Sequence, residues 1–177
     1  ILNKNVKINY YKKISFNTNK IVYNKDKEQI IIDSASNFED SFGNKITSDK
    51  SKFLLDEGLL KINSAEMEDE MNNKYFFKNA LINFNNDEII ADDIKIDFFK
   101  NIFGNKDNDP RLRGNYLYSN NNQSLIKKGV FTTCKKNKDK CPPWQFKAHE
   151  IKHDKSKKTM YYKNAWLEIY DKPVIYF

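Results

Sequence analysis

The sequence predicts an all-β protein built from repeated short, bent antiparallel strands. Three observations lead to this class: short segments in which apolar and polar residues alternate, polar turn signals between them, and a weak internal repeat. With 177 residues, 39% of them apolar and 14% aromatic, the chain is long enough to bury a core and too rich in Phe and Tyr for a disordered tail. We therefore expect a globular domain.

The expected strands follow one another along the whole chain. Because successive side chains of a strand point to opposite faces, each alternating segment has one apolar and one polar face. In chain order the segments are NKIVYN, EQIIID, NKITSD, GLLKIN, KYFFKNALINF, EIIADDIKIDFF, KKGVFTT, WQFKA and AWLEIYDKPVIYF, and the turns between them include NKDKEQ, FGNK, DEGL, DEMNNK, FNNDE and SNNNQS. Many short strands at intervals of about ten residues are typical of a sandwich, a barrel or a solenoid-like roll.

A repeat accompanies these strands. A small residue follows apolar residues at alternate positions and is itself followed, three residues later, by another apolar residue. The small residues are Ala35, Ser64, Ala91 and Ala148, which are 29, 27 and 57 positions apart, and a degenerate copy falls near 114–120. In the copy from Leu60 to Met67, alternation places Ser64 on the apolar face, and the skip to Met67 predicts a bend or bulge there. A small residue at the bend would let two sheets meet at a fold.

The segment AHEIKHD contains His149, Glu150 and His153 in the H-E-x-x-H pattern of zinc metalloproteases. In the repeat this segment occupies the place of ADDIKID at 91–97, so both are expected to be strands. Residues four apart lie about 13 Å apart on a strand, too far for two imidazoles to share one zinc ion. We therefore expect strand histidines that face solvent, with a metal-dependent hydrolase as a minor alternative.

The charge of the chain limits the classes of partner that we expect. The net charge of +7 comes almost wholly from lysine, since Arg111 and Arg113 are the only arginines. Base readout and aromatic stacking favour arginine, so no nucleic-acid partner is expected. The sequence also has no run of 18 or more apolar residues, which a membrane-spanning helix would need.

Cys134 and Cys141 flank a lysine-rich loop in a C-x6-C arrangement. A local disulfide, bonds to cysteines outside these residues, and two unpaired thiols all remain open from the spacing. Cysteines beside an exposed, charged loop are unlike buried core thiols, which favours oxidation and an extracytoplasmic compartment.

Three segments near the end of the chain, KKGVFTTC, PPWQFKAHEIKHD and AWLEIYDKPVIYF, resemble in order the signature of the lipopolysaccharide-assembly outer-membrane protein family, LptD/OstA. In that family a GVYTTC-like strand precedes a Trp-containing strand with an A-x-x-I motif and a segment that leads into the transmembrane barrel. The resemblance covers about 127–177 well, and the weaker repeats at 14–126 look like OstA-type β-jellyroll units.

The resemblance implies a fold and an organisation. It implies an OstA-like β-jellyroll of bent antiparallel strands that forms a V-shaped roll with an apolar groove. Residues 1–177 would be one periplasmic domain, with 1–13 as a candidate flexible leader and 127–177 as the segment leading to a C-terminal outer-membrane barrel absent from this chain. It also implies that Cys134 forms a disulfide to the barrel, while Cys141 is less regular in the family pattern, so a local bond stays open.

The resemblance also implies a function at the periplasmic face of a Gram-negative outer membrane. The domain would bind the acyl chains of lipopolysaccharide and pass them from a periplasmic OstA-like bridge protein to the barrel of the same polypeptide and its plug lipoprotein. Transport of this kind needs no catalytic residue, cofactor or metal, so no enzyme is expected. The alternatives are an extracytoplasmic module that recognises carbohydrate or protein, and a free periplasmic lipopolysaccharide bridge protein.

Acyl chains need a continuous apolar slot, which the inward faces of bent strands would supply. The expected lipid-binding residues are Ile62, Met67, Phe76, Ile82, Ile89, Ile94, Ile96, Val130, Trp144, Phe146, Ile151, Leu167 and Ile169. Lysines at the groove rim are expected to attract lipid phosphates. The strands around Ile14 to Tyr23 are expected to dock the bridge protein by edge pairing.

Overall fold

A computed structural model of the chain describes residues 1–102, 104–136, 142–157 and 159–177. Within these residues it is all-β, with 13 strands in one sheet whose pairs are all antiparallel. The strands are β1 (Leu2–Tyr10), β2 (Ile14–Asn24), β3 (Gln29–Ile32), β4 (Ser36–Asp40), β5 (Lys45–Leu54), β6 (Leu59–Glu68), β7 (Lys74–Asn83), β8 (Glu88–Asp97), β9 (Arg111–Ser119), β10 (Gln123–Thr132), β11 (Trp144–Asp154), β12 (Thr159–Ile169) and β13 (Lys172–Tyr176). The predicted fold class is confirmed at this level. In the described part of the chain, no helix is long and apolar enough to cross a membrane.

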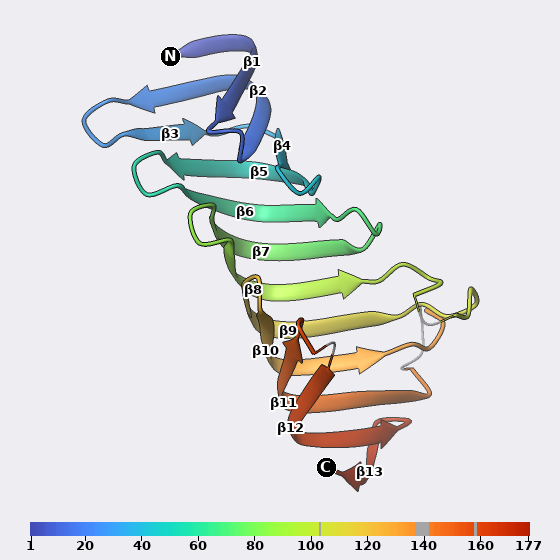
Figure 1. Cartoon of the computed structure of the whole chain (residues 1–177). Helices are drawn as coiled ribbons and strands as arrows, with labels where there is room; N and C mark the ends of the chain where they lie inside the picture. The colour runs from blue at the N-terminus through green and yellow to red at the C-terminus, as the bar shows by residue number, and fades with distance from the viewer. Residues whose placement is uncertain (103, 137–141, 158) are drawn as a thin grey trace.

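The sheet is a meander in which each strand pairs with the next along the chain. The one variation is that β3 and β4 both pair with β2 on one side and β5 on the other, so they act as a single strand interrupted at 33–35. Figure 1 shows the result: strands stacked one below another in an elongated body, with the two termini at opposite ends. Such a stack buries its apolar face only because the strands themselves bend.

The bend lies near the middle of each long strand. In β6, β8, β10 and β12 it contains a residue with positive φ: Ser64 (50°), Asp93 (48°), Lys128 (51°) and Asn164 (49°). Each of these residues immediately precedes, or lies two after, a small buried residue of the inner side. The small buried residues of the inner side near the bends are Ala65, Ala80, Ala91, Gly114, Gly129, Ala148 and Ala165. Of these, Ala80 pairs with Ala91, and Ala148 pairs with Gly129 on one side and Ala165 on the other. Small side chains leave room for the two halves of each strand to fold toward each other.

The bend in β6 differs in phase from the prediction. Ser64 is exposed and adopts the positive φ, whereas the neighbouring Ala65 is buried, so the skip in alternation falls between Ile62 and Ala65. Polar residues tolerate the left-handed region better than most because their side chains can hydrogen-bond locally. The bend itself was therefore predicted correctly, but its inward small residue was not.

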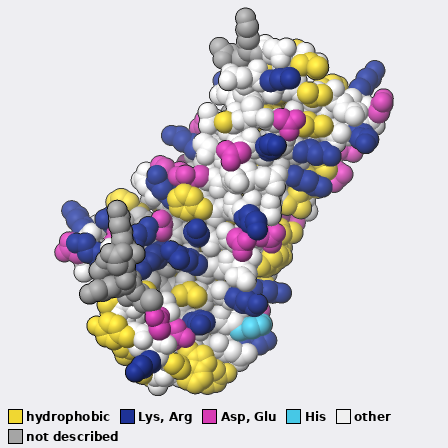
Figure 2. Space-filling view, turned by 180° about the vertical axis from the view of Figure 1, so that it is seen from behind, with side chains coloured by type: hydrophobic (Ala, Val, Ile, Leu, Met, Phe, Trp, Pro, Cys, Tyr) yellow, Lys and Arg dark blue, Asp and Glu magenta, His cyan; other side chains and the backbone are white. Residues whose placement is uncertain are grey.

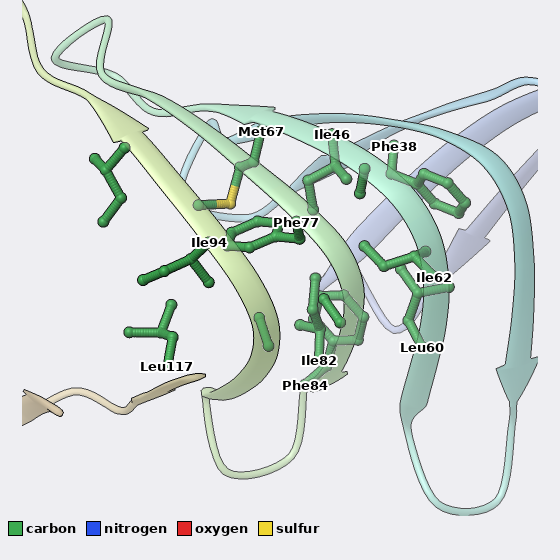
Figure 3. Close-up of a cluster of buried hydrophobic side chains, with 14 of the residues drawn as sticks. Phe38, Ile46, Leu60, Ile62, Met67, Phe77, Ile82, Phe84, Ile94 and Leu117 are labelled. Carbon is green, nitrogen blue, oxygen red and sulfur yellow. The ribbon is translucent and has the colours of Figure 1, made fainter. Parts of the chain in front are cut away.

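The bend divides the sheet into two half-sheets whose inner faces pack together. Half-sheet 1 includes 59–63 of β6, 80–83 of β7 and 88–92 of β8, and half-sheet 2 includes 65–68, 74–77 and 94–97 of the same strands. Figure 3 shows Met67, Phe77 and Ile94 side by side along the curved ribbons, with Ile62 and Ile82 from the other half-sheet nearby. One hydrophobic cluster of buried residues runs from Ile14 to Ala165.

Two hairpin turns at the outer end of half-sheet 2 are built alike. Asp40 accepts hydrogen bonds from the backbone N–H groups of Phe42 and Asn44 and from the Asn44 side chain, at 2.7 to 2.9 Å. Asp69, 29 residues later, binds Met71 and Asn73 in the same way. Local bonds of this type fix the turn without help from the core. The repeat thus extends from the strands into their turns.

The N-terminal residues depart from two predictions. Leu2–Tyr10 form the paired strand β1, so 1–13 are not a flexible leader. The segment from Ile14 to Tyr23 lies in β2, which pairs with β1, β3 and β4 and is therefore an interior strand. The edge of the described sheet at this end is β1 instead.

Candidate apolar interior and its mouth

The inner face is a continuous apolar surface enclosed between the two half-sheets. Cross-strand partners carry it from strand to strand: Ile62 opposite Ala80, Ile82 opposite Ile89, and Ile126 opposite Ile151. Most of its side chains are almost fully buried, as Ile62, Ile94 and Ile151 are at 1% exposure each. Side chains therefore fill the space between the half-sheets when no ligand is bound.

Most of the predicted lipid-binding residues lie on this inner face. Those that are buried in the core are Ile62, Met67, Ile82, Ile94, Ile96 and Ile151. Those that are partly buried or exposed, but share the inner face by register, are Ile89, Trp144, Phe146, Leu167 and Ile169. Alternation thus identified the face correctly, although lipid binding itself stays a prediction.

Phe76 and Val130 belong to the outer face. Phe76 lies opposite Lys95 and Glu66, and its neighbour Phe77 is the buried residue, at 3% exposure. Val130 lies opposite Arg113 and Lys147. In both strands two adjacent apolar residues lie beside the bend, where alternation changes phase, so the choice between them failed. Phe131 lies two residues from the inward Gly129, as alternation requires, whereas Phe77 lies three residues from the inward Ala80, because the step of three at the bend separates them.

Several residues of the inner face were missing from the prediction, either because alternation changes phase beside a bend or because alternation is weak in their segments. They are Phe16, Phe38, Ile46, Phe53, Leu60, Phe77, Leu112, Leu117 and Ile126 among the buried set, and Phe131 among those packed against it. Four of them come from the strands before Leu55, so the interior begins well before the first predicted residue.

The interior becomes more open toward the C-terminal strands. Aromatic rings follow one another from Phe131 to Trp144, Phe146 and Tyr162, with centroids 5.7 to 6.4 Å apart, and Phe146 also contacts Phe177 at 5.9 Å. None of these rings is fully buried. Figure 2 shows hydrophobic side chains gathered at this end of the molecule, whereas lysines and carboxylates are interspersed over the rest of that face. Partly solvated rings at one end of a packed interior are where an apolar ligand can first make contact.

A cleft of about 470 Å³ opens between the outer ends of the two half-sheets; we call it the mouth cleft. Its floor is apolar, formed by Ile82, Phe84 and Ile89. One wall comes from the turn at 40–44 of half-sheet 2, and the other from the turns at 83–87 and 119–121 of half-sheet 1. Because Ile82 also belongs to the core, the cleft leads directly onto the inner face.

Two lysines border the mouth cleft. The Lys13 ammonium donates to the Phe84 carbonyl oxygen at 2.7 Å and lies 3.4 Å from Asn85 Oδ1, which joins the β1–β2 turn to the β7–β8 turn across the mouth. The Lys155 ammonium donates to the Asn120 carbonyl oxygen and to Ser119 Oγ, the latter at 3.2 Å. Partial burial lowers the pKa of Lys155, because the charged form loses hydration there.

A second cleft, of about 630 Å³, lies on the outer face near the bend. Phe76 and the buried Phe77 contribute to its lining, together with polar residues that include Asn37, Glu66, Lys78 and Lys95. Lys78 also pairs with Asp93 at 3.6 Å. The arrangement offers one ring face and several hydrogen-bonding groups.

The H-E-x-x-H segment is part of strand β11, as predicted, which removes the helical geometry that a metalloprotease requires. His149 is exposed and adjoins the bend, while His153 is half-buried opposite Met160. Cys134 is half-buried, and its Sγ lies 3.7 Å from the Trp144 carbonyl oxygen. Cys141 lies outside the described residues, so its pairing stays a prediction.

The fold and interior define an elongated, bent antiparallel β-sheet protein that encloses an apolar inner face and opens at a polar-walled mouth. Compared with protein-family models and with the sequences of curated proteins, the chain matches none.

Proposed function

We propose that this protein is an OstA-like β-jellyroll domain that binds the acyl chains of lipopolysaccharide between its half-sheets and passes them along the strand stack. The observation that carries the proposal is the unbroken apolar inner face from β2 to β12, which runs along the length of an elongated body. The resemblance of 127–177 to the LptD/OstA signature supports the same role.

The packed interior requires that lipid binding and side-chain rearrangement occur together. Acyl chains would enter where the rings of Phe146 and Tyr162 are partly solvated, or through the mouth cleft. Contacts between protein side chains would then be replaced by contacts of similar area between the acyl chain and those side chains. The half-sheets would separate by opening at the bends, with strand pairing kept. No bond is made or broken in this process, so the proposal includes no enzyme activity, cofactor or metal.

The proposed partners follow from the two ends of the sheet. At the N-terminal end we assign docking of a periplasmic bridge protein to β1 in place of β2, because an edge strand offers unpaired backbone groups to a partner strand. At the C-terminal end, β13 would lead toward an outer-membrane barrel and its plug lipoprotein. The domain would then act at the periplasmic face of the outer membrane.

Titration of the chain with fluorescently labelled lipopolysaccharide tests this proposal. Phe146→Asp places a carboxylate on the inner face at its open end, so we expect lipopolysaccharide affinity to fall by about tenfold or more. Trp166→Asp is the matched control, because Trp166 lies on the outer face of the neighbouring strand opposite Lys147. Equal losses in both variants, or none in either, would contradict binding between the half-sheets.

The outer cleft favours one alternative, a module that recognises carbohydrate. Sugars stack on aromatic rings and hydrogen-bond to polar side chains, and Phe76 with Asn37 and Glu66 offers both. Phe76→Ala should abolish oligosaccharide binding in a glycan array if this alternative holds, and should leave lipopolysaccharide affinity unchanged if the lipid is held between the half-sheets.

A further inference from the structure

The mouth cleft combines an apolar floor continuous with the core and two lysine ammoniums at its border. The lysines come from positions far apart in sequence. Lys13 lies in the β1–β2 turn, and Lys155 follows β11 directly. Their placement at one opening depends on the bending of the sheet.

Hydrogen bonding leaves each lysine with capacity for a ligand. An ammonium has three N–H donors, and each of these two lysines uses two of them on neighbouring oxygens within the described part of the protein. Neither lysine forms an ion pair with a described carboxylate. One donor on each lysine is thus available to an anion at the cleft.

Two carboxylates also line the cleft and are already engaged. Asp40 accepts three hydrogen bonds from Phe42 and Asn44, and Asp87 accepts one from the Asn121 amide at 3.0 Å. These bonds come from neutral donors and hold the carboxylates within the turns. Both carboxylates keep their negative charge, but neither forms an ion pair with Lys155. Burial lowers the pKa of the Lys155 ammonium, and an anionic ligand in contact with it would stabilise its charged form.

We propose that the mouth cleft binds the phosphate head group of an acylated lipid, with Lys13 and Lys155 as its phosphate contacts and Ile82, Phe84 and Ile89 under the first part of its acyl chain. This inference rests on the proposed lipid-conduit function and names the place where the polar part of the ligand would sit. The head group would remain at the mouth while the chain lies on the inner face. Lys13 would then donate its remaining N–H to phosphate and keep its bond to the Phe84 carbonyl oxygen.

Calorimetric titration of the full chain with three probes tests the inference: dodecyl phosphate below its micelle-forming concentration, inorganic phosphate, and dodecyl maltoside. For K13Q/K155Q we expect dodecyl phosphate to bind about tenfold more weakly, since charge-assisted hydrogen bonds are lost, and dodecyl maltoside to bind unchanged. The control K61Q/K152Q removes the same charge from exposed outer-face positions and should leave both affinities as they are. Urea denaturation of each variant verifies folding.

The outcomes separate this inference from the proposed function. If K13Q/K155Q binds dodecyl phosphate as tightly as the unmodified protein, or if K61Q/K152Q weakens it equally, the head-group site is wrong while the apolar conduit stands. If inorganic phosphate binds as tightly as dodecyl phosphate, the site is one for free phosphate, and the lipid assignment is overturned. If neither amphiphile binds the unmodified protein, the conduit proposal fails as well.

Discussion

Phe76 and Phe77 are chemically identical neighbours on β7 that have opposite environments. Phe77 packs on the inner face with Tyr75, at a ring-centroid distance of 6.3 Å, whereas Phe76 lies among Lys78 and Lys95 on the outer face. Tyr75 in turn donates its hydroxyl to Asp69 at 2.9 Å, and burial together with this carboxylate raises the pKa of Tyr75. Because Phe76 and Phe77 have the same side chain, comparing them separates the effect of facing inward from the effect of side-chain type.

Replacing each phenylalanine by alanine should give very different losses of stability. Phe77→Ala removes a fully packed ring and leaves a cavity, so we expect the free energy of unfolding to fall by about 3–5 kcal/mol. Phe76→Ala should cost about 1 kcal/mol or less, since most of its surroundings are solvated polar groups. Chemical denaturation of both variants measures the difference. Similar losses would mean that the inner face is not the stabilising one.

The bends are the defining feature of the long strands. With one exception, the residue with positive φ at each bend has a short polar side chain. Ser64, Asp93 and Asn164 have short polar side chains, which tolerate the left-handed region, but β10 has Lys128 there. Lysine has no comparable local hydrogen bond to offset the steric cost. The next residue, Gly129, is inward, and a Cβ at that position would lie 2.5 Å from Ile151 Cδ1.

Lys128→Asn should therefore stabilise the protein, by about 0.5–1 kcal/mol, because asparagine adopts positive φ at lower cost. The control is Lys127→Asn at the preceding strand position, where Lys127 lies over the Tyr116 ring at 5.6 Å and φ is not positive. There asparagine should destabilise the protein, because it is disfavoured in strands. Thermal unfolding of the two variants checks the opposite signs, and a loss of stability in Lys128→Asn would contradict the steric account of the bend.

At the same scale, the sequence could predict the strands but not the phase of alternation through each bend. Alternation is local, and it correctly identified Ile89, Ala91 and Ile94 as one face. At a bend the spacing between inward residues changes from two to three. Where two apolar residues are adjacent, as Val130 and Phe131 are, the sequence then does not indicate which of them faces inward. The mouth cleft was beyond sequence analysis for another reason, since Lys13 and Lys155 meet only through the sheet as a whole.

The whole molecule has a closed middle and a more open C-terminal end. The core side chains of the middle strands, such as Phe53, Ile62 and Ile94, are nearly inaccessible, whereas Phe146, Tyr162 and Phe177 are partly or largely solvated. In a stack of strands that contact mainly their neighbours, such a gradient means that one end can rearrange without unfolding the other. Lipid would enter at an end and advance by local separation of the half-sheets.

Lipopolysaccharide binding between the half-sheets should raise the stability of the protein. A ligand present at 100 times its Kd stabilises the folded state by about 2.7 kcal/mol if it does not bind the unfolded chain. We expect a rise in the midpoint of thermal unfolding with lipopolysaccharide, and a much smaller rise for Phe146→Asp than for Trp166→Asp. Equal rises in both variants would indicate that the lipid binds elsewhere on the surface.

The most direct measurement of the central claim is photocrosslinking from Tyr161 and Tyr162, one at a time, in cells that make lipopolysaccharide. These neighbours are almost equally exposed, at 48% and 41%, but Tyr162 faces inward opposite Ile151 and Tyr161 faces outward opposite Lys152. With a benzophenone side chain at each position, a lipid conduit predicts a lipopolysaccharide adduct at 162 and none at 161. Adducts at both positions, at 161 alone, or at neither would contradict passage of the lipid between the half-sheets.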